Sequence, residues 1–183
     1  MIEVIRNIVA IIRGNILCVV FRIRHDLLVR LFSGAQFNIK SSARVNFERG
    51  VMIGRNTIIT VRENAVFSMG EMSSLNADCK IACQEKITIG KNTIFGPNVF
   101  VYDHDHVFDY DGVKRNEFVT KPVQIGENCW IGAGTIILKG TVIGDRCVIG
   151  AGSVVKGNIP AGSIFIQRRQ DRIIDNNKDE AIQ

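Results

Sequence analysis

Aliphatic residues recur at every sixth position in the C-terminal half of the chain, and this spacing predicts its fold. The recurring positions are Ile125, Ile131, Ile137, Ile143, Ile149 and Val155. A period of six fits neither an amphipathic helix nor an alternating strand. It is typical of a β-helix, in which short parallel strands stack coil upon coil and aliphatic side chains fill the interior. We therefore predict an all-β solenoid.

Four Ile-Gly pairs carry the pattern toward the N-terminus. They are Ile53-Gly54, Ile89-Gly90, Ile125-Gly126 and Ile143-Gly144. Their separations of 36, 36 and 18 residues predict that all four occupy one position of an 18-residue coil. The repeat disappears between Val101 and Val123, so residues 107–122 are predicted to form one protruding loop. The solenoid is predicted over residues 34–165, followed by a C-terminal tail at 166–183.

Residues 1–33 have a different pattern, with aliphatic residues at nearly every second position and five arginines against Glu3 and Asp26. We predict a basic, amphipathic helical segment. Its longest uncharged run, residues 14–21, is far shorter than the roughly 20 residues that span a bilayer. Two compatible interpretations stay open: the segment caps the open end of the solenoid, or it lies on the inner face of a membrane with its arginines at anionic headgroups.

Composition narrows the class of protein. The chain has 183 residues, 46% of them hydrophobic, which is enough for one domain with its own core. Its five cysteines are an odd number without a C-x-x-C pair, so we expect reduced core thiols and no metal site. The positive charge is spread along the chain without an aromatic-basic stripe, so no nucleic-acid partner is expected. The absence of a cleavable signal pattern predicts a cytoplasmic protein.

Histidine is scarce, and two of the three histidines, His104 and His106, fall where the solenoid gives way to the loop. Loops on rigid scaffolds often carry chemistry, and an imidazole can accept a proton near neutral pH. Side chains alternate along a strand, so His104 and His106 are expected to point the same way while Asp103 and Asp105 point elsewhere. The alternative is two solvated histidines in an acidic turn.

Two motifs in the C-terminal half reproduce a family signature. They read Trp130-Ile131-Gly132-Ala133-Gly134, matching W-I-G-x, and Val148-Ile149-Gly150-Ala151-Gly152-Ser153-Val154-Val155, matching V-I-G-A-G-S-x-V. Over about residues 50–165 the chain resembles the hexapeptide-repeat acyltransferases, which are left-handed parallel β-helix enzymes that use acetyl-CoA. It is most similar to their galactoside and maltose O-acetyltransferase branch. The resemblance implies a left-handed coil and a homotrimer whose sites lie between neighbouring prisms.

The same resemblance implies site residues for the acceptor. In the family, a histidine 24 residues before the tryptophan of W-I-G deprotonates the acceptor hydroxyl, and His106 stands at that distance from Trp130. An asparagine further upstream contacts the acceptor in the family, and Asn76 matches its spacing from the base, although a structural role within a coil turn is the alternative for Asn76. His104 and Asp105 are further candidates for binding the substrate.

For acetyl-CoA, the resemblance implies contacts along the coils and near the C-terminus. The implied residues are Trp130, Ala133, Ala151, Lys156, Arg168 and Arg172. The two alanines would let the pantetheine arm approach the backbone, and the basic residues suit the phosphates. The chain lacks the family's C-terminal G-x-P turn, so the choice among Arg168, Arg169 and Arg172 stays open. Trp130 would lie beside the thioester arm or at a subunit contact.

The function implied by the resemblance is transfer of acetyl to a sugar hydroxyl. The basic hydrophobic N-terminal segment is similar to that of capsule, O-antigen or exopolysaccharide O-acetyltransferases, whose acceptor would be a sugar or a lipid-linked glycan. Three alternatives stay open. One is a serine or sugar-nucleotide N-acetyltransferase of the same fold. Another is a γ-type carbonic anhydrase with His25 as the third zinc ligand, and the last is a β-helix that only acts as a scaffold.

Overall fold

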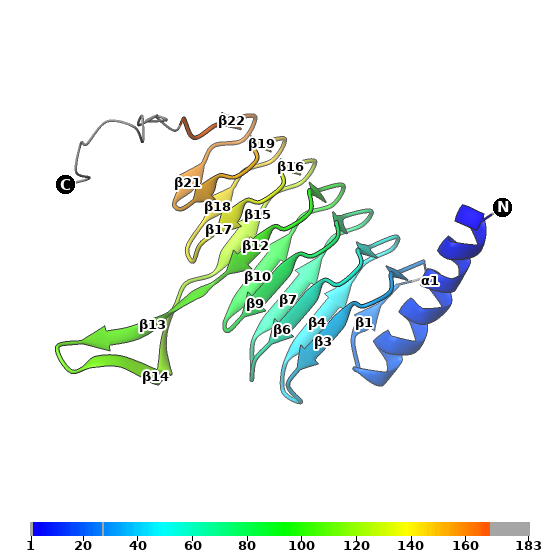
Figure 1. Cartoon of the computed structure of the whole chain (residues 1–183), viewed down its shortest axis with the longest axis horizontal. Coiled ribbons are helices and arrows are strands. Elements are labelled where there is room, and N and C mark those ends of the chain that lie inside the picture. The colour runs from blue at the N-terminus through cyan, green and yellow to red at the C-terminus, as the bar shows by residue number, and fades with distance from the viewer. Residues whose placement is uncertain (1, 27, 169–183) are drawn as a thin grey trace, which may run out of the picture.

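The computed structural model describes residues 2–26 and 28–168. The described residues form a three-sided prism with one parallel sheet on each side. Figure 1 shows its stacked coils, with a helix at the N-terminal end and a long hairpin projecting from the side. The fold is the predicted left-handed parallel β-helix. Each complete coil contributes one short strand to each of three parallel sheets.

The strands of each sheet follow one another along the prism axis. The first sheet contains β1 (Arg24–His25), β4 (Arg44–Phe47), β7 (Val66–Met69), β10 (Lys86–Ile89), β15 (Val123–Ile125), β18 (Val142–Ile143) and β21 (Asn158–Ile159). The second contains β2 (Arg30–Leu31), β5 (Met52–Ile53), β8 (Ser74–Leu75), β11 (Ile94–Phe95), β16 (Trp130–Ile131), β19 (Val148–Ile149) and β22 (Ile164–Phe165). The third contains β3 (Gln36–Ile39), β6 (Ile58–Val61), β9 (Lys80–Cys83), β12 (Phe100–Tyr102), β17 (Ile136–Ile137) and β20 (Val154–Val155).

The six-residue spacing is the repeat of this prism. Ile125, Ile131 and Ile137 lie on the first, second and third sheets in turn, and all are at most 3% exposed. Ile131 pairs with Ile149 of the next coil, so equivalent side chains stack directly upon each other. The prediction of an aliphatic interior is therefore confirmed.

The prediction that all four Ile-Gly pairs occupy one coil position is wrong. Ile53 lies in the second sheet, whereas the isoleucines of the other three pairs lie in the first. The N-terminal coils are longer than the C-terminal ones, since Ile53 pairs with Leu75 where a strict repeat would place residue 71. The extra residues lie in the first and third sheets, where the early strands from β3 to β10 have four residues and the later ones have two or three.

Asparagine, aspartate and glycine form the tight corner between the second and third sheets. At this corner Asn56, Asp78, Asn98, Gly134 and Gly152 all have positive φ angles. Short polar side chains and glycine tolerate this left-handed conformation best. Backbone hydrogen bonds join the successive turns, for example from Gly152 N–H to the Ala133 carbonyl at 2.7 Å. The corner is therefore a regular column along the prism.

The helix α1 (Ile2–Val20) precedes the coils. The sequence predicts a helical segment over residues 1–33, and this extent is too long. Residues 24–25 and 30–31 already form β1 and β2 of the first coil, which pair with β4 and β5 of the second coil. The helical part of the prediction is confirmed only as far as Val20.

A Schellman motif ends the helix. Arg22 adopts a positive φ of 53°, the Ile23 N–H donates to the Cys18 carbonyl, and the Arg22 N–H donates to the Val19 carbonyl. These two bonds satisfy carbonyl groups that the helix leaves unpaired. Glycine usually fills the left-handed position of this motif, so the arginine at position 22 gave no sign in the sequence that the helix stops here.

A row of small residues lets α1 pack closely on the first coil. Ala10 and Cys18 are buried, and Gly14 lies between them on the same side of the helix. A Cβ atom on Gly14 would clash with the carbonyl oxygen of Val29. The helix therefore caps the N-terminal end of the core with its small-residue face.

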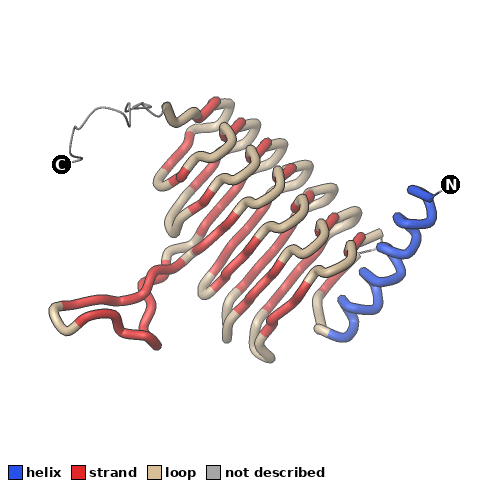
Figure 2. Tube along the Cα trace, in the orientation of Figure 1, coloured by secondary structure: helices blue, strands red, loops and turns tan. Residues whose placement is uncertain are grey.

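The predicted loop is an antiparallel hairpin of β13 (His104–Asp109) and β14 (Gly112–Thr120), which projects from the prism in Figure 2. It begins three residues before the predicted start at 107.

At the far end of the prism, the Gln167 side-chain amide accepts from the Val154 N–H and donates to its carbonyl, which satisfies the open edge of β20. Most of the predicted tail, residues 169–183, lies outside the described residues.

Candidate active site

The two candidate histidines stand at the base of the hairpin, where it leaves the corner between the third and first sheets. In the antiparallel register His104 lies opposite Thr120 and His106 lies opposite Phe118. The register shifts just after His106, which marks a bulge at this point of the hairpin. The straight, coil-anchored part of the hairpin therefore holds both imidazoles.

Asp103, directly before the hairpin, is fully buried and saturated with hydrogen bonds. Its carboxylate accepts from the backbone N–H groups of Gln84, Glu85 and Lys86 at 2.8–2.9 Å. His104 adds a contact of 3.1 Å between its Nδ1 and one carboxylate oxygen. Burial raises the pKa of Asp103, but the hydrogen bonds from His104 and from the backbone outweigh burial and bring it below its ordinary value. Asp103 is thus a buried anion.

This buried anion fixes the tautomer of His104. An ionised carboxylate can only accept hydrogen bonds, so Nδ1 of His104 carries the proton in the contact with Asp103. The neutral ring then has its free lone pair on Nε2. Only 16% of the His104 side chain is exposed, so the ring is held in one orientation.

His104 and His106 share one pocket, as the alternation of side chains predicts. Both rings pack against Phe118, with centroid distances of 5.3 Å and 4.7 Å. The pocket has a volume of about 310 Å³. It is lined by Thr60, Arg62, Ala82, Cys83, Gln84, His104, His106, Arg115 and Phe118. Within the described residues no polar partner holds His106, and its ring is exposed.

Asp105 is separate from this pocket. Its carboxylate lies 2.7 Å from the Lys139 ammonium, in an ion pair that ties the hairpin to the following coil. Because it lies between the two histidines on an extended strand, its side chain leaves the opposite face. The structure therefore places this predicted acceptor residue on the outside of the pocket.

Asn76 lies at a different corner of the prism from His106. It follows β8 at the corner between the second and third sheets, where its Oδ1 accepts from the Ala77 N–H at 2.7 Å. There it lines a second pocket, of about 230 Å³, together with Arg6 and Arg55. Within one chain, the structure does not bring Asn76 and His106 together.

Two predicted contacts with coenzyme A share the corner of Asn76. Ala133 and Ala151 are exposed and stacked on successive coils there. Trp130 lies nearby on β16, with its indole 54% exposed on the second sheet. These residues form a continuous ridge of small side chains with one aromatic beside it.

The predicted basic contacts are scattered. Lys156 is exposed at the corner of the hairpin, one sheet away from the two alanines. Arg168 is exposed after the last strand. Arg169 and Arg172 lie outside the described residues. A single chain therefore does not bring all the predicted coenzyme A contacts together.

Sequence reasoning missed three contributors to the histidine pocket and the role of Asp103. Arg62 is distant from His104 in sequence and reaches the pocket because coils stack: its N–H donates to the Cys83 carbonyl of the next coil. Phe118 and Arg115 come from the returning strand of the hairpin, and only the antiparallel pairing puts them there. The sequence Asp103-His104-Asp105-His106 drew attention to Asp103, but its burial and its contact with His104 were not predicted.

The cysteines and histidines do not form a metal centre in the part of the chain that is described. No group of three or more His, Cys, Asp or Glu side chains could hold an ion there. His25 lies on β1, at the N-terminal end of the first sheet, far along the prism from the hairpin. All five cysteines are free and buried. Among residues 2–26 and 28–168, no helix is long and apolar enough to cross a membrane.

The comparisons with known proteins agree with this architecture. The family model "Bacterial transferase hexapeptide (six repeats)" matches residues 122–157. The chain is 46% identical over 96 residues to nodulation protein L of Rhizobium meliloti (strain 1021), which covers 52% of each protein. It therefore spans about half the length of that curated relative.

One further relative and one solved structure of similar fold cover more of the chain. The putative lipopolysaccharide biosynthesis O-acetyl transferase WbbJ of Escherichia coli (strain K12) is 28% identical over 140 residues, 69% of each protein. The crystal structure of the hexapeptide-repeat acetyltransferase VCA0836 from Vibrio cholerae, complexed with acetyl coenzyme A, superposes with a TM-score of 0.58 at 23% identity, covering 72% of this chain and 65% of that one. The resemblance predicted from the sequence motifs is confirmed.

Proposed function

We propose that this protein is an O-acetyltransferase that transfers acetyl from acetyl-CoA to a sugar hydroxyl. The match of residues 122–157 to the bacterial transferase hexapeptide repeat supports this function. One observation carries the proposal: a buried carboxylate and two imidazoles converge at the base of the hairpin, beside the coils that bear the repeat. Acyl transfer to a hydroxyl requires a proton acceptor, and a second oriented imidazole can hold the acceptor beside it.

In this proposal His106 is the general base. Its exposed imidazole takes the proton of the acceptor hydroxyl while the hydroxyl oxygen attacks the thioester carbonyl carbon. The tetrahedral intermediate collapses, the carbon–sulfur bond breaks, and the coenzyme A thiolate takes the proton back from the imidazolium. General base catalysis of this kind contributes about 10²–10⁴-fold to the rate. The rest comes from holding both substrates in line.

His104 supports the acceptor in the same proposal. Asp103 holds its Nδ1–H, which leaves Nε2 free to accept a hydrogen bond from a sugar hydroxyl. Arg62 and Arg115 line the same pocket, and within the described residues neither forms an ion pair. Two unpaired guanidinium groups favour an acceptor that carries a carboxylate or phosphate.

The site is proposed to be complete only in a homotrimer. Asn76, Ala133 and Ala151 lie at one corner of the prism and His106 at another, so a neighbouring prism has to supply the second half. Cyclic symmetry creates such a pairing at each interface. The resemblance to WbbJ, a putative lipopolysaccharide biosynthesis O-acetyl transferase, supports an acceptor sugar in the biosynthesis of O-antigen, capsule or exopolysaccharide. The proposed place of this acetylation is the cytoplasmic side of the membrane.

Acetyl-CoA turnover, followed by release of the coenzyme A thiol, tests the proposal. The panel contains neutral sugars, acidic sugars, sugar phosphates, amino sugars and serine, and His106→Ala is compared with wild type. We expect turnover with a sugar hydroxyl and a loss of about 10²–10⁴-fold in kcat for His106→Ala. His25→Ala is the matched control, because its ring lies in the first coil and contacts the Ile23 carbonyl.

Three results would contradict the proposed sugar O-acetyltransferase function. Turnover only with amino acceptors or serine would favour the related N-acetyltransferases or serine acetyltransferases. A His106→Ala protein with wild-type kcat would remove His106 from the chemistry. A wild-type protein that does not bind coenzyme A in a calorimetric titration would leave the scaffold interpretation.

A further inference from the structure

The outer face of α1 is unusually apolar. Eight aliphatic side chains on this helix are between 51% and 70% exposed. They are Val4, Ile5, Ile8, Val9, Ile12, Ile16, Val19 and Val20. A helix on a protein surface normally directs its apolar side chains inward and its polar ones outward. Here the small residues face the coil and the large aliphatic ones face away from it.

The exposed residues form one continuous stripe. Ile5, Ile8, Ile12, Ile16 and Val19 are spaced three or four apart, so they follow one side of the helix from end to end. Contiguous apolar surfaces of this kind mark a contact with another molecule or a membrane.

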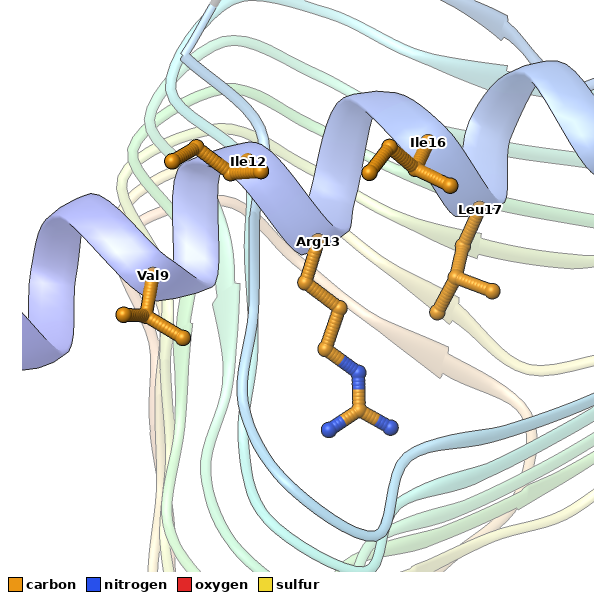
Figure 3. A pocket seen from close by; sticks show the side chains of 5 residues that line it. All are labelled: Val9, Ile12, Arg13, Ile16 and Leu17. Atoms are coloured by element: carbon orange, nitrogen blue, oxygen red, sulfur yellow. The ribbon is translucent and has the colours of Figure 1, made fainter.

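A groove deepens one edge of the stripe. It has a volume of about 370 Å³ and is lined by Val9, Ile12, Arg13, Ile16 and Leu17 (Figure 3). Arg13 is its only charged residue, and Figure 3 shows its guanidinium at the end of an extended side chain, away from the helix axis. Such an arginine covers apolar surface with its methylene stem and presents its charge at the boundary with water.

The prediction that the positive charge is spread along the chain is wrong, because the charge is concentrated at the end of the molecule that carries α1. Residues 1–62 contain ten arginines and lysines against three acidic residues, a net charge of +7. The whole chain carries +5, so residues 63–183 carry −2. Arg22, Arg24 and Arg44 line one pocket at the start of the first sheet, just after the helix. The apolar stripe and this positive charge therefore lie at the same end of the molecule.

We propose that α1 docks the protein on an anionic lipid surface. The helix lies flat, its aliphatic stripe enters the acyl boundary, and the surrounding arginines bind lipid phosphates. Charge complementarity favours an anionic lipid surface as the occupant, because the end of the molecule that carries the stripe has a net charge of +7. The helix caps the end of the prism in Figure 1, so its outer face looks away from the coils and can meet a flat surface.

Lipid binding does not depend on the proposed acetyl transfer. If both hold, the hairpin pocket is held at a fixed height above the membrane, where a lipid-linked acceptor would reach it. A 19-residue helix is about 28 Å long, so lying flat it offers a contact comparable to that of other interfacial helices.

Flotation of the full chain with vesicles tests the proposal. Phosphatidylcholine vesicles are compared with vesicles that also contain phosphatidylglycerol, at low and high salt. We expect flotation with the anionic vesicles that weakens as salt rises. Ile12→Gln/Ile16→Gln should lower the vesicle affinity by roughly tenfold or more, since two large side chains leave the acyl boundary. Arg13→Gln/Arg24→Gln should lower the preference for anionic lipid.

The matched control is Ile164→Gln/Ile166→Gln. These isoleucines are 70% and 69% exposed and lie at the opposite end of the prism. Flotation of the control should equal that of wild type. Size-exclusion chromatography accompanies each variant, and acetyl-CoA turnover with a soluble acceptor shows that a failure of lipid binding is separate from a failure of catalysis.

The proposal is overturned if wild type fails to float with anionic vesicles. It is equally overturned if the helix variant and the control lose binding alike, since lipid would then contact the chain elsewhere. A smaller oligomer for Ile12→Gln/Ile16→Gln, together with unchanged flotation, would show that a second copy of the chain covers the stripe.

Discussion

At the scale of single residues, Asp103 links the stability of the coil to the orientation of His104. Its carboxylate is fully buried and accepts three backbone N–H groups and one imidazole. Asn in its place puts an NH₂ group against donors that then lack an acceptor. Asp103→Asn should cost about 2–3 kcal/mol in the free energy of unfolding, measured with urea at pH 7. Asp111→Asn, at an exposed position, should change it by about 0.5 kcal/mol or less.

The same residue predicts a pH dependence. The pKa of Asp103 in the folded protein is below its ordinary value of 3.8, so its contribution to stability is fully present above that pH. It is lost as the pH falls through the lower pKa of the folded state. The difference in the free energy of unfolding between wild type and Asp103→Asn should shrink below about pH 4, as the carboxylate of the folded protein takes up a proton. A difference that does not shrink below about pH 4 would exclude a depressed pKa.

The cysteines give a further prediction at this scale. Burial raises the pKa of Cys79 to about 11 and that of Cys18 to about 12, and it raises the pKa of Cys83 and Cys129 as well. A pKa of 11 leaves about one thiol in a thousand ionised at pH 8. Native protein should react with a disulfide reagent at pH 8 orders of magnitude more slowly than denatured protein. One fast thiol in the native protein would show that a coil opens.

At the scale of elements, the hairpin is separable from the solenoid. No residue from 107 to 117 is buried, and its two strands pair only with each other. Replacing residues 107–117 with Asn-Gly closes a two-residue turn between the paired residues His106 and Phe118. The stability should change by about 0.5 kcal/mol or less.

Activity of the shortened protein separates the acceptor pocket from the coenzyme A site. Loss of Arg115 from the pocket should raise the KM for an acidic acceptor, while the Kd for coenzyme A in a calorimetric titration should match that of wild type. A lower thermal midpoint together with weaker coenzyme A binding would instead show that the hairpin supports the coils.

Elements whose period is strict were predictable from the sequence, and elements that depend on local exceptions were not. Ile131 and Ile149 follow the 18-residue repeat, so the spacing alone gave their sheet and their burial. The sheet of Ile53 was mispredicted because longer strands lengthen its coil, and a regular spacing elsewhere in the chain does not indicate such extra residues. The end of α1 was not predicted because Arg22, rather than glycine, adopts the left-handed conformation there.

At the scale of the whole molecule, spacing along the chain predicted individual site residues but not their arrangement in space. His104 and His106 were expected to face one pocket, because alternation is a local property of a strand. Arg62 reaches that pocket only through the stacking of coils of unequal length. The separation of Asn76 from His106 follows from the three-sided cross-section, which no distance in sequence encodes.

That separation leads to a prediction for the assembly. If His106 of one prism meets Asn76 of its neighbour, His106→Ala and Asn76→Ala should each be inactive alone but complement each other in mixed trimers. With equal amounts and random exchange of subunits, one interface in four joins an intact His106 to an intact Asn76, so about a quarter of wild-type activity should return. Subunits are mixed after mild denaturation, and sedimentation confirms the trimer. Activity that stays absent in verified mixed trimers would mean that the two residues do not act in one shared site.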